Sequence, residues 1–290
     1  MVYLAALASS VLYGAADFLG GLASKRASTP WVVSISQASG LVVLLATVGL
    51  LPAADPTIPD VLWGAAAGLA GTLGVGLLYR ALAIGTMGVV APITAVCAVA
   101  LPVLVSLGRG EWPGPFALAG IGLAMVAIAL VSQQPPVMPA AGPAADRRGL
   151  PPGVPHALLS GVAIGLFFVI IAEARPESGL WPLVGARAGA VPFCLLVGVL
   201  SRGHPLRSMP RRAALTAAGA GIVDMTANVL YLLASRMGSL AVVVTLSSLY
   251  PASTVVLARA VLGERLHRTQ MIGMACALVA VALIVAGSER

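Results

Sequence analysis

Long apolar stretches separated by short polar segments run along almost the whole chain. A helix needs about 20 apolar residues to cross a bilayer, and Gly, Pro and charged residues mark where each stretch ends. Ten spans are predicted: Val2 to Leu22, Trp31 to Leu51, Pro59 to Tyr79, Gly85 to Leu107, Gly114 to Ser132, Pro155 to Ala174, Leu180 to Leu200, Ala213 to Ser235, Ser239 to Val261 and Thr269 to Ala286. The pattern therefore predicts an all-α polytopic membrane protein with ten transmembrane helices.

The composition excludes several other classes. Of the 290 residues, 59% are hydrophobic and only 9% are charged, far below the charged share of a soluble domain. The net charge of +7 comes from Lys and Arg scattered through short connections, without a basic face that could follow phosphates, so no nucleic-acid partner is expected. The three cysteines stand alone in apolar segments, so no metal or other cofactor is predicted.

The two halves of the chain repeat one another. Gly110, Glu111 and Gly120 match Gly263, Glu264 and Gly273 at an offset of 153 positions, and Trp31 and Trp181 match at an offset of 150, which also places Gln37 opposite Arg187. Between the halves lies a Pro/Ala-rich stretch that is unsuited to helix packing. We predict a first repeat at 1–133, a linker at 134–154 and a second repeat at 155–290.

Five helices in each repeat imply that the two copies enter the membrane in opposite senses. Inverted repeats with a site at their interface are typical of alternating-access transporters, and helices interrupted by Pro or Gly mark that site. Pro92 and Pro102 in the fourth span and Pro251 in the ninth predict such interruptions.

The segments GRGEWPGPFALAGIGLAMVAIAL and LYPASTVVLARAVLGERLHRTQMIGMACALVAVALIVAG resemble the EamA-type repeats of the drug/metabolite transporter superfamily. The second segment has the family's Pro, GE pair, Gln and Gly, whereas the first has Ala117 in place of the Gln. The resemblance covers essentially the whole chain. It implies ten helices in two inverted repeats and movement of a small solute, and it does not imply which solute.

Polar groups inside the eighth span form the first candidate site. Asp224 lies at the centre of this span, where an ionisable group costs at least about 2.5 to 3.5 kcal/mol and usually faces a partner or a water-filled space. Asn228 and Tyr231 follow at helical spacing on the same face. These residues are expected to contact solute or protons; the alternative is a structural hydrogen bond between helices.

The first and seventh spans carry the other charged candidates. Asp17 shares a helix face with Ser10, Tyr13 and glycines, which predicts either a lumen-lining face or a close-packing seam. Arg187 lies about two turns inside the seventh span. It could reach the membrane interface, or it could pair with a substrate carboxylate, with Asp17 or with Asp224.

Hydroxyl groups and the repeated glutamates complete the list. Ser248, Thr245, Ser247 and Tyr250 precede Pro251, and Thr94 lies in the paired helix; they could contact solute or bond to their own helix. Glu111 and Glu264 belong to the repeated hairpin motif and are interpreted as structural caps or hinge contacts. Glu173, near Arg175, is expected on a solvated loop.

The leading hypothesis is a secondary transporter of the cytoplasmic membrane, not an enzyme, that exports a small metabolite such as an amino acid or a drug-like solute. No Walker A motif is present. A carboxyl group shielded from water favours its protonated form, so Asp224 or Asp17 is predicted to exchange a proton against substrate. If only one of them does so, the central position of Asp224 in its span favours Asp224. The expected partners are a small-molecule solute, membrane lipids and protons. The protein is expected to be a monomer or a homodimer.

Two rival functions fit the sequence less well. An intramembrane aspartyl protease would use two Asp residues, but its GxGD context is absent and the duplication stays unexplained. A membrane scaffold or lipid-handling protein without solute flux predicts an apolar groove open to lipid. Within the transporter class, few aromatic residues and a single central Asp argue against a cation cage.

The charge distribution gives an orientation that conflicts with the family. Connections after odd-numbered spans carry eleven Lys and Arg residues, and those after even-numbered spans carry three. The positive-inside rule then places both termini outside. The resemblance implies both termini inside.

Overall fold

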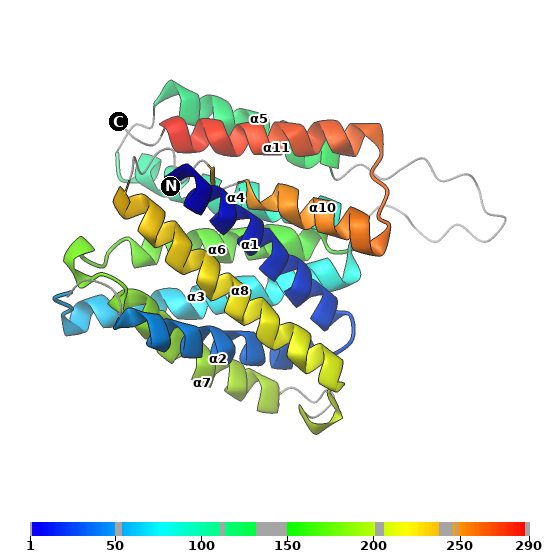
Figure 1. Ribbon diagram of the computed structural model, residues 1–290. Helices are drawn as coiled ribbons and strands as arrows, with labels where there is room; N and C mark the ends of the chain where they lie inside the picture. Colours follow the sequence, from blue (N-terminus) through cyan, green and yellow to red (C-terminus); the bar gives the residue numbers. More distant parts are fainter. Residues whose placement is uncertain are drawn as a thin grey trace.

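The computed structural model describes residues 2–49, 54–110, 114–131, 150–200, 206–237, 246–247 and 249–287. Ten α-helices form in these ranges, and they lie in layers from α5 and α11 at one edge to α2 and α7 at the other (Figure 1). Their bounds are α1 (Val2–Ser24), α2 (Thr29–Val48), α3 (Ile58–Ile84), α4 (Met87–Gly108), α5 (Pro115–Val131), α6 (Val154–Ile171), α7 (Trp181–Leu200), α8 (Arg211–Met237), α10 (Tyr250–Leu262) and α11 (Arg268–Gly287).

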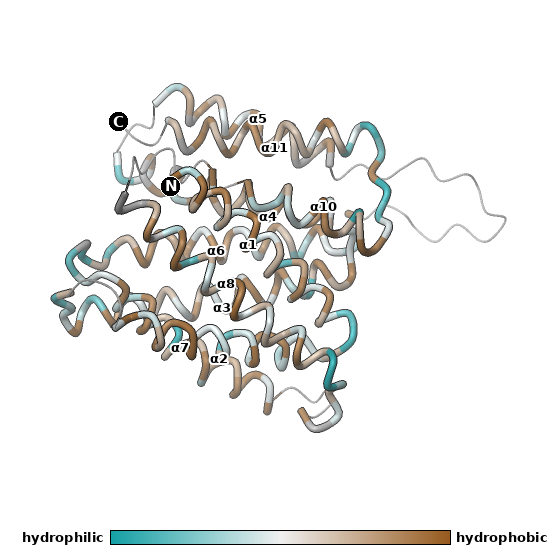
Figure 2. The backbone as a smooth tube through the Cα atoms, in the orientation of Figure 1, coloured by the Kyte–Doolittle hydropathy of each residue, from teal (hydrophilic) through white to brown (hydrophobic). Residues whose placement is uncertain are grey.

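The helices have the apolar composition of membrane spans. Six of them, α1, α2, α3, α6, α7 and α8, are long and apolar enough to cross a bilayer, and shorter apolar helices lie in α4, α5, α10 and α11. Figure 2 shows apolar segments along the helices and hydrophilic residues gathered near their ends. The chain is a multi-pass membrane protein.

Most predicted spans agree with these helices to within a few residues. Helix α3 is longer than predicted at both ends, and it begins with a capping box in which the Thr57 backbone N–H donates to Asp60 Oδ2 at 2.9 Å. The predicted linker, except its last residues, and the first part of the ninth span lie outside the described residues.

Proline acts differently in the two helices that the sequence singled out. Helix α4 continues through Pro92 and Pro102, so neither proline ends the helix. Helix α10 instead begins at Tyr250 with Pro251 in its first turn, where a missing backbone N–H removes no helical hydrogen bond. The interruption is therefore confined to the second repeat.

Helix packing is symmetric when the two halves are exchanged. Helix α1 packs on α8 as α6 packs on α3, α2 packs on α8 as α7 packs on α3, and α1 packs on α10 as α6 packs on α4. Individual bonds follow the same exchange: the Ser9 hydroxyl donates to the Ala227 carbonyl at 3.0 Å, and the Ser160 hydroxyl donates to the Gly74 carbonyl at 2.7 Å. The duplication seen in sequence is thus also present in the packing.

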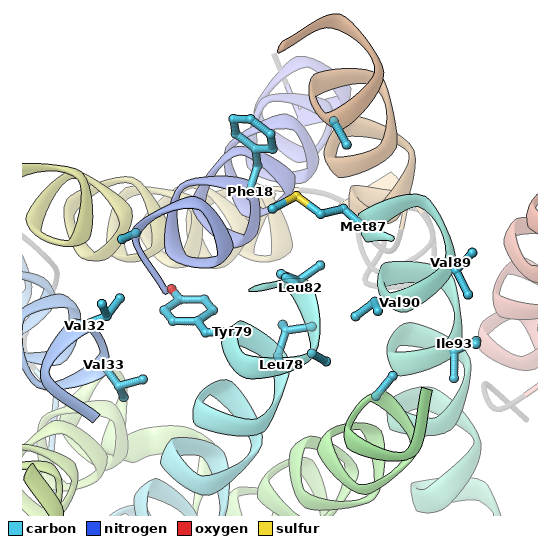
Figure 3. Close-up of a cluster of buried hydrophobic side chains, with 14 of the residues drawn as sticks. Phe18, Val32, Val33, Leu78, Tyr79, Leu82, Met87, Val89, Val90 and Ile93 are labelled. Atoms are coloured by element: carbon cyan, nitrogen blue, oxygen red, sulfur yellow. The ribbon is translucent and has the colours of Figure 1, made fainter. Parts of the chain in front are cut away.

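The largest buried cluster joins both halves of the chain. It includes Phe18, Tyr79, Leu82 and Met87 from the first half and side chains of α6, α7, α8 and α10 from the second. Figure 3 shows Tyr79 beside Val32 and Val33 of α2, below the α1 backbone. This cluster holds together the helices that carry the predicted site residues.

Candidate functional site

An ion pair between two helices of the second half forms the centre of the site. Arg187 Nη2 of α7 lies 2.6 Å from Asp224 Oδ2 of α8, and their side chains are 15% and 29% exposed. The Asn228 amide donates to the Asp224 backbone carbonyl at 2.8 Å and to its carboxylate at 3.5 Å. The structure therefore favours the alternative in which Arg187 pairs with Asp224 over a role at the membrane interface.

Helix α1 brings Asp17 and Tyr13 to the same place. Asp17 lies close enough to Asp224 for their charges to interact, and Tyr13 lies within electrostatic range of Asp17, Arg187, Asp224 and Tyr231. Six of the predicted site residues thus converge from the two halves of the chain. Ser248, the seventh, lies outside the described residues.

The Asp17 carboxylate differs from that of Asp224 in its surroundings. The Asp17 side chain is half-buried. Within the described part of the chain, its carboxyl group makes no hydrogen bond or ion pair. Asp224 is neutralised by Arg187. The Asp17 carboxyl group is therefore the acidic member of this cluster that has no cation partner among the described residues.

The glycines beside Asp17 make room for neighbouring helices. A Cβ at Gly14 would collide with the α10 backbone at Tyr250, and one at Gly20 would collide with the ring of Tyr79. Gly21 faces Leu82 in the same way. This part of the Asp17 face is a packing seam, and it brings two further tyrosines to the site.

Tyr79 was missed by the sequence analysis, and Tyr250 was named there only for its hydroxyl group. Tyr79 lies near Asp17 and Asp224, with its hydroxyl at Ser36, and the Tyr250 ring makes an edge contact with Tyr13 at a centroid distance of 6.3 Å. A signal for Tyr79 was present, because the pair Leu78-Tyr79 recurs as Leu230-Tyr231.

The first half carries an uncharged counterpart of the ion pair. The Gln37 amide of α2 donates to the Thr72 hydroxyl of α3 at 3.1 Å, in a buried position. Gln37 corresponds to Arg187, and Thr72 lies 152 positions before Asp224, close to the repeat offset. The same helix pair therefore carries a neutral hydrogen bond in one half and two charges in the other.

Other candidates have structural contacts. The Thr94 hydroxyl donates to the α6 carbonyl of Ala157 at 3.2 Å, and the Ser247 hydroxyl donates to the α1 carbonyl of Ala6 at 3.4 Å. Glu264 accepts hydrogen bonds from the backbone N–H groups of Met87 and Gly88, both at 3.1 Å, and so caps the start of α4. Its cap role is confirmed.

The remaining charged candidates lie away from the ion pair. Glu173 forms an exposed ion pair with Arg109 at 2.9 Å. Thr245 and Glu111 lie outside the described residues. Among the residues that the structure describes, no group of three His, Cys, Asp or Glu side chains could hold a metal ion.

The described residues form a helical membrane protein with duplicated packing and a polar cluster contributed by both halves, as is typical of polytopic transporters with internal repeats. The family model described as "EamA-like transporter family" matches residues 1–133 and 151–286, and the chain belongs to that family. This agrees with the resemblance to the drug/metabolite transporter superfamily.

Comparison with other proteins adds evidence on the fold alone. A solved structure titled "Crystal structure of protein" is similar at 18% identity and a TM-score of 0.54, with 97% of this chain and 98% of that chain covered. No curated protein matches.

Proposed function

We propose that the protein is a secondary transporter that moves a small metabolite or drug-like solute out of the cell across the cytoplasmic membrane. One observation carries the proposal: Asp17 and Tyr13 of the first half meet the Arg187–Asp224 pair of the second half within apolar helices. Charged groups in a membrane span are costly, and they usually mark a solute or ion pathway.

Alternating access between two inverted repeats is the mechanism that the packing supports. The repeats are assigned to 1–133 and 155–290, with five spans each, and their contacts correspond under exchange of the halves. An odd number of spans would insert the copies in opposite senses. The site would then lie where one repeat rocks against the other.

Contacts between the two repeats hold both ends of α4. Glu264 caps its start, and Arg109, directly after its last residue, pairs with Glu173. A helix of this length spans about 33 Å at 1.5 Å per residue, so the two contacts lie at opposite ends of the helix bundle. Rocking of the repeats would open one contact while the other stays closed.

Asp17 is the better candidate of the two carboxylates for proton exchange. The Asp224 carboxylate forms an ion pair with Arg187, whereas the Asp17 carboxyl group has no such partner in the described ranges. We expect Asp17→Asn to abolish the effect of a pH gradient on flux through liposomes that contain the purified protein. If the flux is unchanged by the pH gradient, by Asp17→Asn and by Asp224→Asn, proton coupling is wrong and the protein is a facilitator or an exchanger.

Orientation is testable separately. The test is a reporter that is active only in the cytoplasm, fused after Arg290. If the excess of Lys and Arg in the odd-numbered connections sets the topology, the C-terminus lies outside and the reporter should be inactive. Cytoplasmic activity would overturn that charge-based assignment and agree with the family.

The transport proposal itself can be tested without knowing the solute. Liposomes that contain the purified protein are loaded with an extract of small metabolites, and the solutes that leave are measured by mass spectrometry. Protein-dependent loss of at least one solute is expected, and Asp17→Asn should reduce it. Loss that equals that of protein-free liposomes for every solute would refute transport.

A further inference from the structure

Two basic pairs lie at the end of the bundle where α1 ends and α8 begins. Lys25 and Arg26 belong to the short connection between α1 and α2, and Arg211 and Arg212 are the first residues of α8. All four side chains are exposed. This end of α1 and α8 lies at the lower right in Figure 1, and Figure 2 shows hydrophilic residues gathered there. We call these four residues the basic cluster.

The packing of α1 and α2 on α8 brings the two pairs together. Helix α1 runs antiparallel to α8, because Ala6 near its start shares a small buried cluster with Ala234 near the end of α8. Helix α2 follows after a short connection, and its Ser39 hydroxyl donates to the Ala218 carbonyl in the first half of α8 at 3.0 Å. The connection between α1 and α2 therefore lies beside the start of α8.

The basic cluster has no carboxylate partner among the residues that the structure describes. None of its four side chains takes part in an ion pair within the described ranges. At this end of the bundle, the carboxylate that the described connections contain is Glu264, and it caps α4. Four neighbouring cations repel one another, so the cluster favours an anion from outside the chain.

The corresponding helix ends of the other half supply their own anion. Helices α6 and α3 pack as α1 and α8 do, and α3 begins at Ile58, 153 positions before Arg211. At those ends Arg175 Nη2 lies 2.9 Å from Asp60 Oδ2 and so joins the two halves of the chain. Ala213 stands where the repeat offset places the counterpart of Asp60. The basic cluster is thus the counterpart of an ion pair whose acid is missing.

A buried hydroxyl group beside the basic cluster lacks a hydrogen bond. Ser24, the last residue of α1, is only 6% exposed, and its Oγ has no hydrogen-bond partner among the described residues. Buried hydroxyl groups nearly always have one. Ser24 precedes Arg175 by 151 positions, the offset between Ser9 and Ser160, so it lies where the other half has its ion pair. A phosphate oxygen bound at the cluster would be an acceptor for this hydroxyl.

An apolar stripe leads from the basic cluster along the outside of α8. Leu215 and Ile222 are 62% and 47% exposed, and they follow Arg211 at helical spacing. Gly219 lies between them, with open space where a Cβ would stand among the described residues. The acyl chain of a lipid could lie along this stripe while its headgroup contacts the cluster. A free phosphate ion would leave the stripe unused.

We infer that the phosphate group of an anionic phospholipid binds to the basic cluster and joins the two halves of the chain at this end of the bundle. Guanidinium and ammonium groups donate strong hydrogen bonds to phosphate oxygens, and basic pockets between membrane helices bind anionic headgroups. The phosphate supplies the negative charge that Asp60 supplies in the other half. This lipid site is separate from Arg187 and Asp224 and does not depend on the proposed transport function.

Binding of defined lipids to the purified protein in a neutral detergent tests this site. The protein is fluorescently labelled, and microscale thermophoresis compares dioleoyl phosphatidylglycerol with dioleoyl phosphatidylcholine at equal mole fractions in the micelles. We expect phosphatidylglycerol to bind at least about tenfold more tightly, and NaCl to weaken its binding. Equal affinities for the two lipids would overturn the inference. Displacement of phosphatidylglycerol by an equal concentration of inorganic phosphate would also overturn it, because the site would then bind a free ion.

Charge variants distinguish a site from a diffusely basic end of the bundle. Arg211→Gln/Arg212→Gln should bind phosphatidylglycerol at least about tenfold more weakly. The matched control, Arg265→Gln/Arg268→Gln, removes two charges from the same end between α10 and α11 and should bind as the wild type does. An equal loss in both double variants would contradict a site at the basic cluster.

A variant of Ser24 tests the placement of the phosphate group. Ser24→Ala should weaken phosphatidylglycerol binding about threefold or more. Without lipid, its thermal unfolding should match that of the wild type, because the hydroxyl has no described bond to lose. Unchanged lipid affinity in Ser24→Ala protein would contradict phosphate binding at this helix end.

Discussion

The neutral pair of the first repeat offers a direct substitution for the ion pair of the second. In the double variant Arg187→Gln/Asp224→Thr, α7 and α8 would carry the pair that Gln37 and Thr72 form between α2 and α3. We expect each single change to destabilise the protein and the double change to recover most of the loss. Transport should still fail, because the charges of Arg187 and Asp224 at the site are gone.

The expected magnitude follows from the geometry of the pair. Opposite charges with centres about 4 Å apart attract by about 4 kcal/mol at an effective dielectric constant of about 20. Loss of water by both groups offsets much of this, and removing one partner of a fully buried pair costs about 3 to 5 kcal/mol. The side chains of Arg187 and Asp224 are 15% and 29% exposed, so the pair is not fully buried, and a cost of about 1 to 3 kcal/mol is expected for Arg187→Gln alone.

Thermal unfolding in detergent of the wild type, both single variants and the double variant provides the double-mutant cycle. A coupling energy of about 1 to 2 kcal/mol is expected, within the range typical of residues in contact. Additive losses, with the double variant as unstable as the two single changes combined, would refute the reasoning that the pair is energetically coupled and replaceable by a neutral one.

Three further predictions concern stability and are measured by thermal unfolding in the same detergent. Glu264→Ala removes the acceptor for two backbone N–H groups of α4 and should cost about 0.5 to 2 kcal/mol; unchanged stability would dismiss the cap. Gly221→Ala should cost about 1 to 3 kcal/mol because its Cβ would collide with α2, whereas Gly219→Ala, with open space in the same helix, should be neutral or stabilising; similar effects would count against close packing there. Asp60→Asn weakens the bonds to Arg175 at the start of α3 and should cost about 1 to 3 kcal/mol, and an unaltered unfolding temperature would argue against that network.

The helices could be predicted from sequence because span length and end residues are local properties. Apolar stretches of the right length fixed most boundaries to a few residues, and Pro251 correctly marked the start of α10. Pro92 and Pro102 did not interrupt α4. The sequence pattern could not separate these cases, because proline is tolerated in a helix interior when neighbouring groups compensate for the lost hydrogen bond.

The site could be predicted in part. The membrane Asp residues and Arg187 stood out because charge in an apolar span is rare. Which of them pair depends on the tertiary structure, and the sequence left several partners for Arg187 open. Tyr79 escaped notice because an aromatic residue in an apolar helix does not stand out as a charge does, and only its recurrence as Tyr231 in the second half marks it. The glycines that place it against α1 make sense only when the packed partner is known.

The central claim is that a solute crosses the membrane through the site formed by Asp17, Arg187 and Asp224. The most direct test compares the small molecules in the medium of cells that lack the protein, cells that contain it and cells that contain Asp17→Asn protein at equal membrane abundance. The claim predicts at least one solute that accumulates outside only with the unaltered protein. Identical media from all three cultures, or equal accumulation with Asp17→Asn protein, would contradict it.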